Sequence, residues 1–213
     1  MNNNSSRFGP LPERNPFSTR ATRPGTRPFL FPPSENPASL LDRLRRNLWW
    51  GEIVGPHGSG KSTLLHALVE QLRQNGRLVR LFVLHADEKR FPIPGEDLRT
   101  WDANTQVVID GFEQLGGWNR ATIKRVCRHR GAGLLVTTHE PVGLPPLFAA
   151  SVSLELAQQL AVDLQRSAEP RVGWDDVRQS FERHAGNLRE VFFELYDLYE
   201  ARRPTPRAKG TAE

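Results

Sequence analysis

Apolar residues along this chain fall into short runs separated by stretches with helical spacing. Four runs have the length and composition of buried parallel strands, and they cover residues 49–54, 78–84, 106–110 and 133–138. Helical spacing follows residue 61 and returns over 119–130. Strands that alternate with helices predict an α/β fold with a parallel sheet, helices on both faces, and a site at the carboxyl edge.

Two further segments extend this pattern. Residues 150–156 predict a fifth strand, and the sequence from Leu160 onward is mostly helical in character. The acidic pair Asp175–Asp176 predicts the start of one helix, and Asn187 the start of another. We therefore expect a five-stranded parallel sheet followed by a small C-terminal helical region.

A helix is also predicted before the first strand. It begins near Pro37, and one face carries Leu40, Leu41, Leu44 and Leu48. Composition then divides the chain into four parts. These are a basic, proline-rich tail without stable order (1–36), the α/β core (37–159), the C-terminal helical region (160–201) and a second disordered basic tail (202–213).

Charge and cysteine content narrow the setting. The net charge is +5, but most of the excess positive charge lies in the two tails. Cys127 is the single cysteine, so no intrachain disulfide can form. No apolar run is long enough to cross a bilayer, and the N-terminus does not resemble a signal peptide. We expect a soluble, cytoplasmic protein without a membrane partner.

One segment matches the phosphate-binding pattern G-x-x-x-x-G-K-S/T. It consists of Gly55, Pro56, His57, Gly58, Ser59, Gly60, Lys61 and Ser62, followed by Thr63. Glycines let successive N–H groups converge on a triphosphate, and the following helix start adds partial positive charge. We expect Lys61 to reach the β- and γ-phosphates of ATP and the Ser62 hydroxyl to ligate Mg²⁺.

The run that ends at Asp110 supplies the second half of such a site. Its apolar residues predict a buried strand, and Asp110 then lies at the carboxyl edge, where a metal-positioning carboxylate is needed. Glu113 is the candidate for orienting the attacking water. We therefore predict Ser62 and Asp110 as Mg²⁺ ligands, and Lys61 and Glu113 as the catalytic residues.

Over residues 37–200 these features resemble a P-loop NTPase of the additional-strand division, closest to AAA+ and STAND ATPases. Residues 110–113, Asp-Gly-Phe-Glu, resemble the STAND form of the Walker B motif. The resemblance implies that His139, after the fourth run, is a sensor of the γ-phosphate. It implies the same role for Arg189, which begins a helix in a lid-like region. AAA+ rings usually carry an arginine finger between the fourth and fifth strands. Residues 140–149 of this chain contain no Arg or Lys for that role.

The sequence thus predicts an ATP- and Mg²⁺-binding P-loop ATPase that hydrolyses ATP slowly and switches its contact with a partner protein. Two alternatives remain open. One is a P-loop kinase for a small molecule or nucleotide, with Asp87 as its key acid, and the other is an adaptor that binds nucleotide without hydrolysis. Nucleic acid is a further possible partner, through the basic tails or the basic helix at 120–130, although a solvated helix face is the favoured interpretation.

Overall fold

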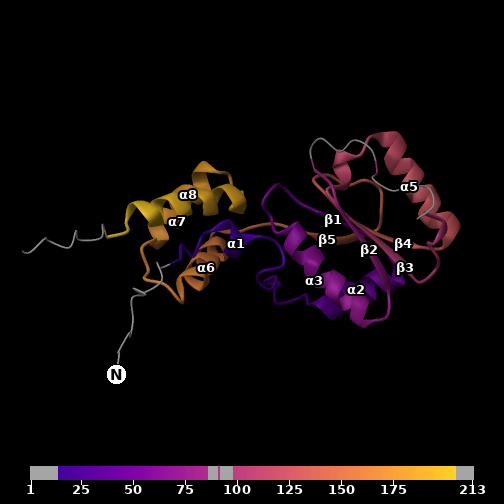
Figure 1. The fold of residues 1–213 in the computed structure, drawn as a ribbon, viewed down its shortest axis with the longest axis horizontal. Helices are drawn as coiled ribbons and strands as arrows, with labels where there is room; N and C mark the ends of the chain where they lie inside the picture. Colours follow the sequence, from indigo (N-terminus) through magenta and orange to yellow (C-terminus); the bar gives the residue numbers. More distant parts are fainter. Residues whose placement is uncertain (1–13, 86–90, 92–97, 205–213) are drawn as a thin grey trace, which may run out of the picture. The chain divides into compact units, whose positions relative to one another are not determined.

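The structure is a computed structural model that describes residues 14–85, 91 and 98–204. The chain forms two compact units. One comprises residues 23–152, and the other combines the described residues up to Thr22 with those from Ser153 onward. Figure 1 labels the helices and strands of both units.

The larger unit is built on a parallel sheet. Its strands are β1 (Trp50–Val54), β2 (Leu78–Val83), β3 (Thr105–Asp110), β4 (Gly133–Thr138) and β5 (Pro146–Ala149). Their order across the sheet is β2-β3-β4-β1-β5, and every neighbouring pair is parallel. The predicted five-stranded α/β fold is confirmed, and β4 lies between the strand before the phosphate loop and the strand that ends in Asp110.

The position predicted for the fifth strand is wrong. The strand lies at Pro146–Ala149, whereas Ser153 accepts a hydrogen bond from the Leu156 amide at 3.2 Å and begins α6 (Leu154–Gln165). Proline lacks the N–H that a central strand must donate, so Pro146 makes this segment resemble a loop in the sequence. As an edge strand paired only with β1, β5 tolerates it.

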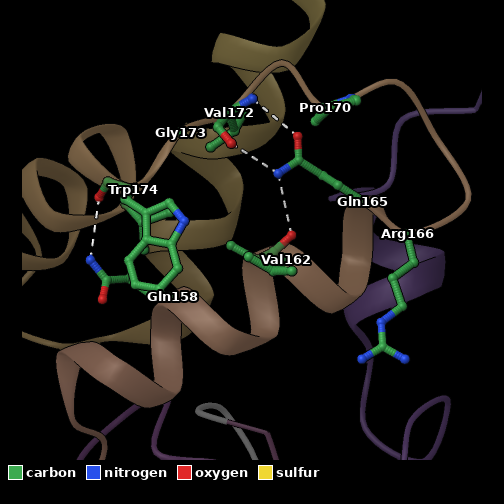
Figure 2. Close-up of a pocket in the computed structure, with 10 residues that line it drawn as sticks. Gln158, Val162, Gln165, Arg166, Pro170, Val172, Gly173 and Trp174 are labelled. Atoms are coloured by element: carbon green, nitrogen blue, oxygen red, sulfur yellow. Dashed lines mark hydrogen bonds between the residues drawn. The ribbon is translucent and has the colours of Figure 1, made fainter.

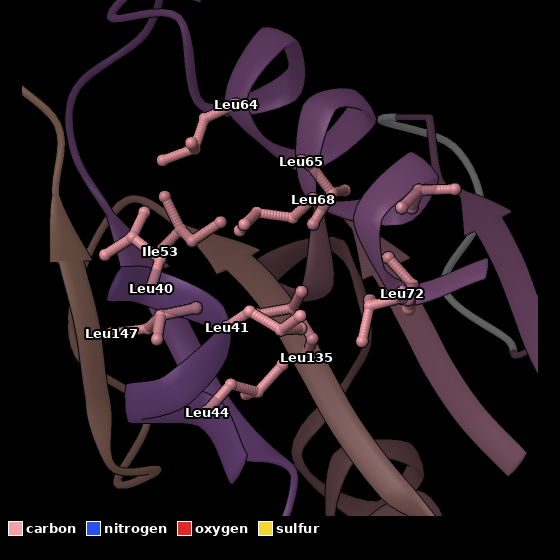
Figure 3. Packing of buried hydrophobic residues seen from close by; sticks show 12 residues of the cluster. Leu40, Leu41, Leu44, Ile53, Leu64, Leu65, Leu68, Leu72, Leu135 and Leu147 are labelled. Carbon is pink, nitrogen blue, oxygen red and sulfur yellow. The ribbon is translucent and has the colours of Figure 1, made fainter. Parts of the chain in front are cut away.

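Helices cover both faces of the sheet. On one face, α2 (Pro37–Arg46) and α3 (Lys61–Gln74) pack against it, and Figure 3 shows their leucines meeting Ile53, Leu135 and Leu147. On the other face lie the short 3₁₀ helix η1 (Phe112–Gln114) and α5 (Gly117–Arg130). Alternate residues of β3 and β4 point to opposite faces, which explains why the consecutive middle residues of both strands are apolar.

Leu48 does not belong to the buried face predicted for the first long helix. Helix α2 ends at Arg46, and Leu48 and Trp49 follow with positive φ angles of 55° and 67°. Leu40, Leu41 and Leu44 are buried as expected, whereas Leu48 is 80% exposed. The turn into β1 therefore rotates Leu48 away from the core.

The smaller unit is helical. It contains α1 (Thr19–Thr22), α6, α7 (Trp174–Arg183) and α8 (Leu188–Ala201). Phe17 is fully buried, with its ring centroid 6.2 Å from that of Phe192 and 6.1 Å from that of Tyr199. The Asn15 amide donates to the Tyr196 carbonyl at 2.9 Å. Residues 14–22, which composition assigns to a tail, thus pack with the C-terminal helices.

Two further observations concern the setting of the protein. Within the described ranges, no helix combines the length and apolarity that crossing a bilayer requires. Cys127 is a buried residue of α5, and burial raises the pKa of its thiol to about 12. A thiol with so high a pKa is a packing residue and not a nucleophile.

Candidate functional site

The loop between β1 and α3 has the backbone that phosphate binding requires. Gly58 and Gly60 have positive φ angles of 70° and 83°, which favour glycine. A Cβ atom on Gly55 would lie 2.4 Å from the Ala150 carbonyl oxygen. Gly60 also stands at the N-cap of α3 without a side chain to occupy the first-turn amides. These N–H groups and the helix dipole form a site suited to an anion.

Lys61 places a buried ammonium group inside this loop. Its Nζ donates to the carbonyl oxygens of Gly55 at 2.6 Å and Pro56 at 2.7 Å. Nδ1 of His139 lies 3.4 Å from the same nitrogen. The residue is only 8% exposed, so its positive charge is weakly screened by solvent and is fixed at the mouth of the loop.

Asp110 ends β3 at the carboxyl edge, and a threonine of the neighbouring strand orients it. The Thr137 hydroxyl donates to Asp110 Oδ1 at 2.5 Å and accepts from the Gly111 amide at 2.9 Å. The first bond holds one carboxylate oxygen of Asp110, and the second holds the hydroxyl that makes it. Sequence reasoning did not identify Thr137, although a polar pair at the end of an apolar strand is a usable signal.

Glu113 and the two histidines form a contact group beside Lys61. Nε2 of His139 lies 2.8 Å from Glu113 Oε1, and its Nδ1 lies 3.2 Å from the Gly55 carbonyl oxygen. The rings of His57 and His139 have centroids 3.7 Å apart. The loop after β4, the loop after β1 and η1 therefore meet at one point. Sequence analysis predicted each residue separately but not this meeting.

Two buried polar atoms at this edge have no hydrogen-bond partner among the described residues. They are Glu113 Oε2 and the Thr138 hydroxyl. Buried polar groups are normally satisfied, so such atoms point to a ligand or ordered water as the missing partner. The Thr138 hydroxyl, the glycine backbone and Lys61 fit the phosphates of a nucleoside triphosphate, and Glu113 Oε2 fits a water molecule as its donor.

The oxygen donors also fit Mg²⁺. Ser62 begins the helix after the loop, and Asp110 provides a carboxylate at the same edge of the sheet. No group of three or more His, Cys, Asp or Glu side chains within the described residues would hold a metal alone. Mg²⁺ ordinarily takes one or two protein oxygens and completes its shell with phosphates and water.

The remaining predicted site residues lie as follows. Ser59 donates through its hydroxyl to the Pro56 carbonyl oxygen at 2.9 Å, and Thr63 lies in the first turn of α3. Arg189 lies at the start of α8 in the smaller unit, and its role as a sensor stays a prediction. Asp87, the acid of the kinase alternative, lies outside the described residues.

A separate cavity of about 350 Å³ lies in the smaller unit, between α6 and α7. Figure 2 shows Val162, Pro170 and Trp174 on its lining and Gln165 beside it. The Gln165 amide donates to the carbonyl oxygens of Ala161 at 3.3 Å and Val172 at 3.0 Å. None of the predicted site residues lines this cavity, so it is separate from the phosphate loop.

Comparison with known proteins relies on structure alone. No family model and no curated protein sequence matches the chain. A DNA replication initiation factor has a TM-score of 0.58 at 13% identity, over 76% of this chain and 59% of that one. The Walker-type ATPase of Pyrococcus abyssi has a TM-score of 0.58 at 12% identity, over 87% and 72%.

AMPPCP-bound DnaA of Aquifex aeolicus has a TM-score of 0.51 at 12% identity, over 76% of this chain and 61% of DnaA. The chain thus spans less than two thirds of the DNA replication initiation factor and of DnaA. Likeness at this identity shows the fold. The chain shares the fold of these solved structures, a parallel sheet with an additional strand between β1 and β3, which agrees with the predicted resemblance to P-loop NTPases of the additional-strand division.

Proposed function

We propose that this protein binds ATP with Mg²⁺ at the 55–63 loop and hydrolyses it slowly, so that the bound nucleotide controls contact with a partner protein. The observation that carries the proposal is the contact group at the mouth of the loop. There the Lys61 ammonium, the His139 ring and the Glu113 carboxylate follow one another within hydrogen-bond distances of 3.4 and 2.8 Å. The reducing cytoplasm is the proposed compartment.

Binding is assigned to the loop and its helix. In the proposal, the backbone N–H groups of the loop surround the phosphates, while Lys61 exchanges its carbonyl partners for the β- and γ-phosphate oxygens. Ser62 and Asp110 hold Mg²⁺, which when bound neutralises charge on the phosphates. Thr137 keeps Asp110 in place for this role through its 2.5 Å hydrogen bond.

Hydrolysis is assigned to Glu113, which orients water beside the terminal phosphate. Its Oε2 is buried without a partner among the described residues, whereas its Oε1 is engaged by His139. With a proton on Nε2 alone, His139 donates to Glu113 and accepts from Lys61 through Nδ1. This arrangement changes when a phosphate oxygen replaces His139 as a partner of the Lys61 ammonium. His139 thereby links the state of the nucleotide to the Glu113 carboxylate. Arg189 is proposed as a second sensor.

The same contact also favours a second candidate, an adaptor that binds ATP without hydrolysis. If Glu113 stays bound to His139 when ATP is present, its carboxylate does not reach the water. The kinase alternative has no comparable support. The acid that ends β3, the strand next to β4, is Asp110, whereas that alternative depends on Asp87.

Glu113→Gln separates the two candidates. The amide preserves size but is a poor base, so we expect ATP affinity to be retained and turnover to fall by about 10²-fold or more. The measurements are ATP affinity by calorimetry and phosphate release at saturating ATP and Mg²⁺. Glu70→Gln, an exposed change on α3, is the control and should leave both unchanged. Equal near-background turnover in wild type and Glu113→Gln supports the adaptor, and undiminished turnover in Glu113→Gln removes Glu113 from the mechanism.

A further inference from the structure

The amino ends of the parallel strands form a second edge of the sheet, opposite the phosphate loop. Helix α2 ends just before β1 with Arg45 and Arg46 in its last turn, and α5 ends just before β4 with Arg128 and Arg130 in its last turn. Arg77 directly precedes β2. Because the strands are parallel, these segments all meet at the same edge.

Two consecutive tryptophans organise the arginines at this edge. The guanidinium carbon of Arg45 lies 5.4 Å from the centre of the Trp49 ring system, and that of Arg77 lies 4.4 Å from it. Arg128 stands over Trp50 at 5.1 Å. Stacking of this kind fixes the plane of a guanidinium group while its N–H edge stays available for hydrogen bonds.

The arginines differ in exposure and therefore in role. Arg77 is 8% exposed and donates to the carbonyl oxygens of Ala103 at 2.7 Å and Thr105 at 2.8 Å. It supports the Trp49 ring from inside. Arg45 has a side chain that is 52% exposed, and Arg46 and Arg128 are also exposed. These three face solvent.

Negative charge at this edge is sparse. Residues 114–138 contain no Asp or Glu, so α5 carries basic residues only. Asp42 lies 3.6 Å from Arg45 as an exposed pair, which is weak in water. Asp102 accepts from the Thr105 hydroxyl at 2.8 Å and the Asn104 amide at 3.0 Å. Within the described ranges, no carboxylate forms an ion pair with Arg46 or Arg128.

A simpler explanation accounts for part of this pattern. Basic residues in the last turn of a helix favour the negative end of its dipole, which explains Arg46 and Arg130 one by one. It does not explain why arginines from three separate segments stack on two consecutive tryptophans, Trp49 on the α2–α3 side of the sheet and Trp50 on the α5 side. Partly exposed aromatic faces between fixed guanidinium groups are the combination that accepts stacked bases and phosphates together.

We propose that single-stranded nucleic acid binds across the amino edge of the sheet, with Arg45, Arg46 and Arg128 on its phosphates and with Trp49 and Trp50, one on each side of the sheet, beside its bases. Bidentate guanidinium contacts suit phosphate oxygens, and the interaction depends on charge rather than on base sequence. An acidic protein partner would use the arginines but would not need the aromatic faces of the indoles. The surface lies on the edge opposite the phosphate loop, so it is distinct from the nucleotide site.

The test compares two triple variants of the full-length protein that both keep the basic tails. Arg45→Gln/Arg46→Gln/Arg128→Gln removes the proposed phosphate contacts. Arg166→Gln/Arg178→Gln/Arg183→Gln removes three exposed arginines of the smaller unit and is the matched control. Fluorescence anisotropy with labelled oligodeoxythymidine gives affinity over a range of salt concentrations, and ATP affinity and thermal unfolding are measured in parallel.

We expect the edge variant to bind oligodeoxythymidine at least tenfold more weakly at low salt. Its log–log salt slope should be less negative by about 2, since each phosphate contact on a single strand contributes about 0.7. The control should keep the wild-type slope, and both variants should keep ATP affinity. Equal losses in both variants, absence of binding by the wild type, or stronger competition by polyglutamate than by unlabelled oligodeoxythymidine would each overturn the proposal.

Discussion

At the scale of single residues, His139 connects the parts of the candidate site. Its two ring nitrogens face Glu113 on one side and Lys61 with the Gly55 carbonyl on the other. A second proton on the ring makes Nδ1 a donor, which favours Gly55 over the Lys61 ammonium. The hydrogen bonds of the His139 ring therefore change when another charged group displaces Lys61 from Nδ1.

Gly55 provides a residue-scale prediction about stability. Gly55→Ala should lower the free energy of unfolding by roughly 1–3 kcal/mol, because the new Cβ meets the backbone oxygen of Ala150 at 2.4 Å and the strand must shift. Chemical denaturation measures this. Gly117→Ala, where a Cβ meets nothing within 4 Å, should be neutral or slightly stabilising. If both variants unfold alike, the close approach at Gly55 is not a constraint.

At the scale of elements, hydrophobic pattern predicted most of the sheet. The apolar run at 133–138 matches β4 (Gly133–Thr138), and the run at 106–110 differs from β3 by one residue. Strands buried on both faces have a strong signal because nearly every position must be apolar. The edge strand β5 does not need an apolar residue at every position, and it contains Pro146. The hydrophobic pattern therefore did not predict it.

The candidate site was likewise predictable only in part. The phosphate loop and Asp110 could be predicted because glycines, a lysine and a strand-end acid occur at fixed spacing in the chain. The contact between Glu113 and His139 is not, since it joins η1 to the loop after β4 and depends on sheet order. Helix ends depend on tertiary contacts too, as the exposed Leu48 shows.

Helix α7 is tied to the end of α8 by a charged contact that predicts a pH dependence. Asp176 accepts from Arg202 through both carboxylate oxygens, at 2.6 and 2.9 Å, and from the Gly173 amide at 2.8 Å. The hydrogen bond with Arg202 lowers the pKa of Asp176. Because the pKa of Asp176 is lower in the folded state than its unfolded-state value of about 3.9, the charged carboxylate stabilises the fold above that pH. This contribution is lost as pH falls through the folded-state pKa.

Asp176→Asn should therefore destabilise the protein by roughly 1 kcal/mol near neutral pH, and the difference from wild type should shrink below about pH 4. Denaturant unfolding at several pH values measures it. Asp175→Asn is the control, because that side chain is 81% exposed and pairs with Arg178 at the surface. A deficit that is the same at every pH would show that the charge of Asp176 is not the cause.

At the scale of the whole molecule, separate surfaces carry separate proposed tasks. The carboxyl edge of the sheet carries the proposed nucleotide site, the amino edge carries the proposed nucleic-acid surface, and the smaller unit contains Arg189. Composition predicted the basic ends of the chain. It did not predict that Phe17 is buried with α8, because two aromatic contacts far apart in sequence leave no periodic pattern.

The most direct test of the central claim is the ATP affinity of Lys61→Ala beside that of the wild type, measured by calorimetry with Mg²⁺ present. The account predicts clear binding by the wild type and a loss of at least about 10²-fold in the variant, because the buried ammonium that pairs with the β- and γ-phosphates is gone. Circular dichroism should show the variant folded. Unaltered ATP affinity in a folded Lys61→Ala protein would contradict the assignment of residues 55–63 as the nucleotide site.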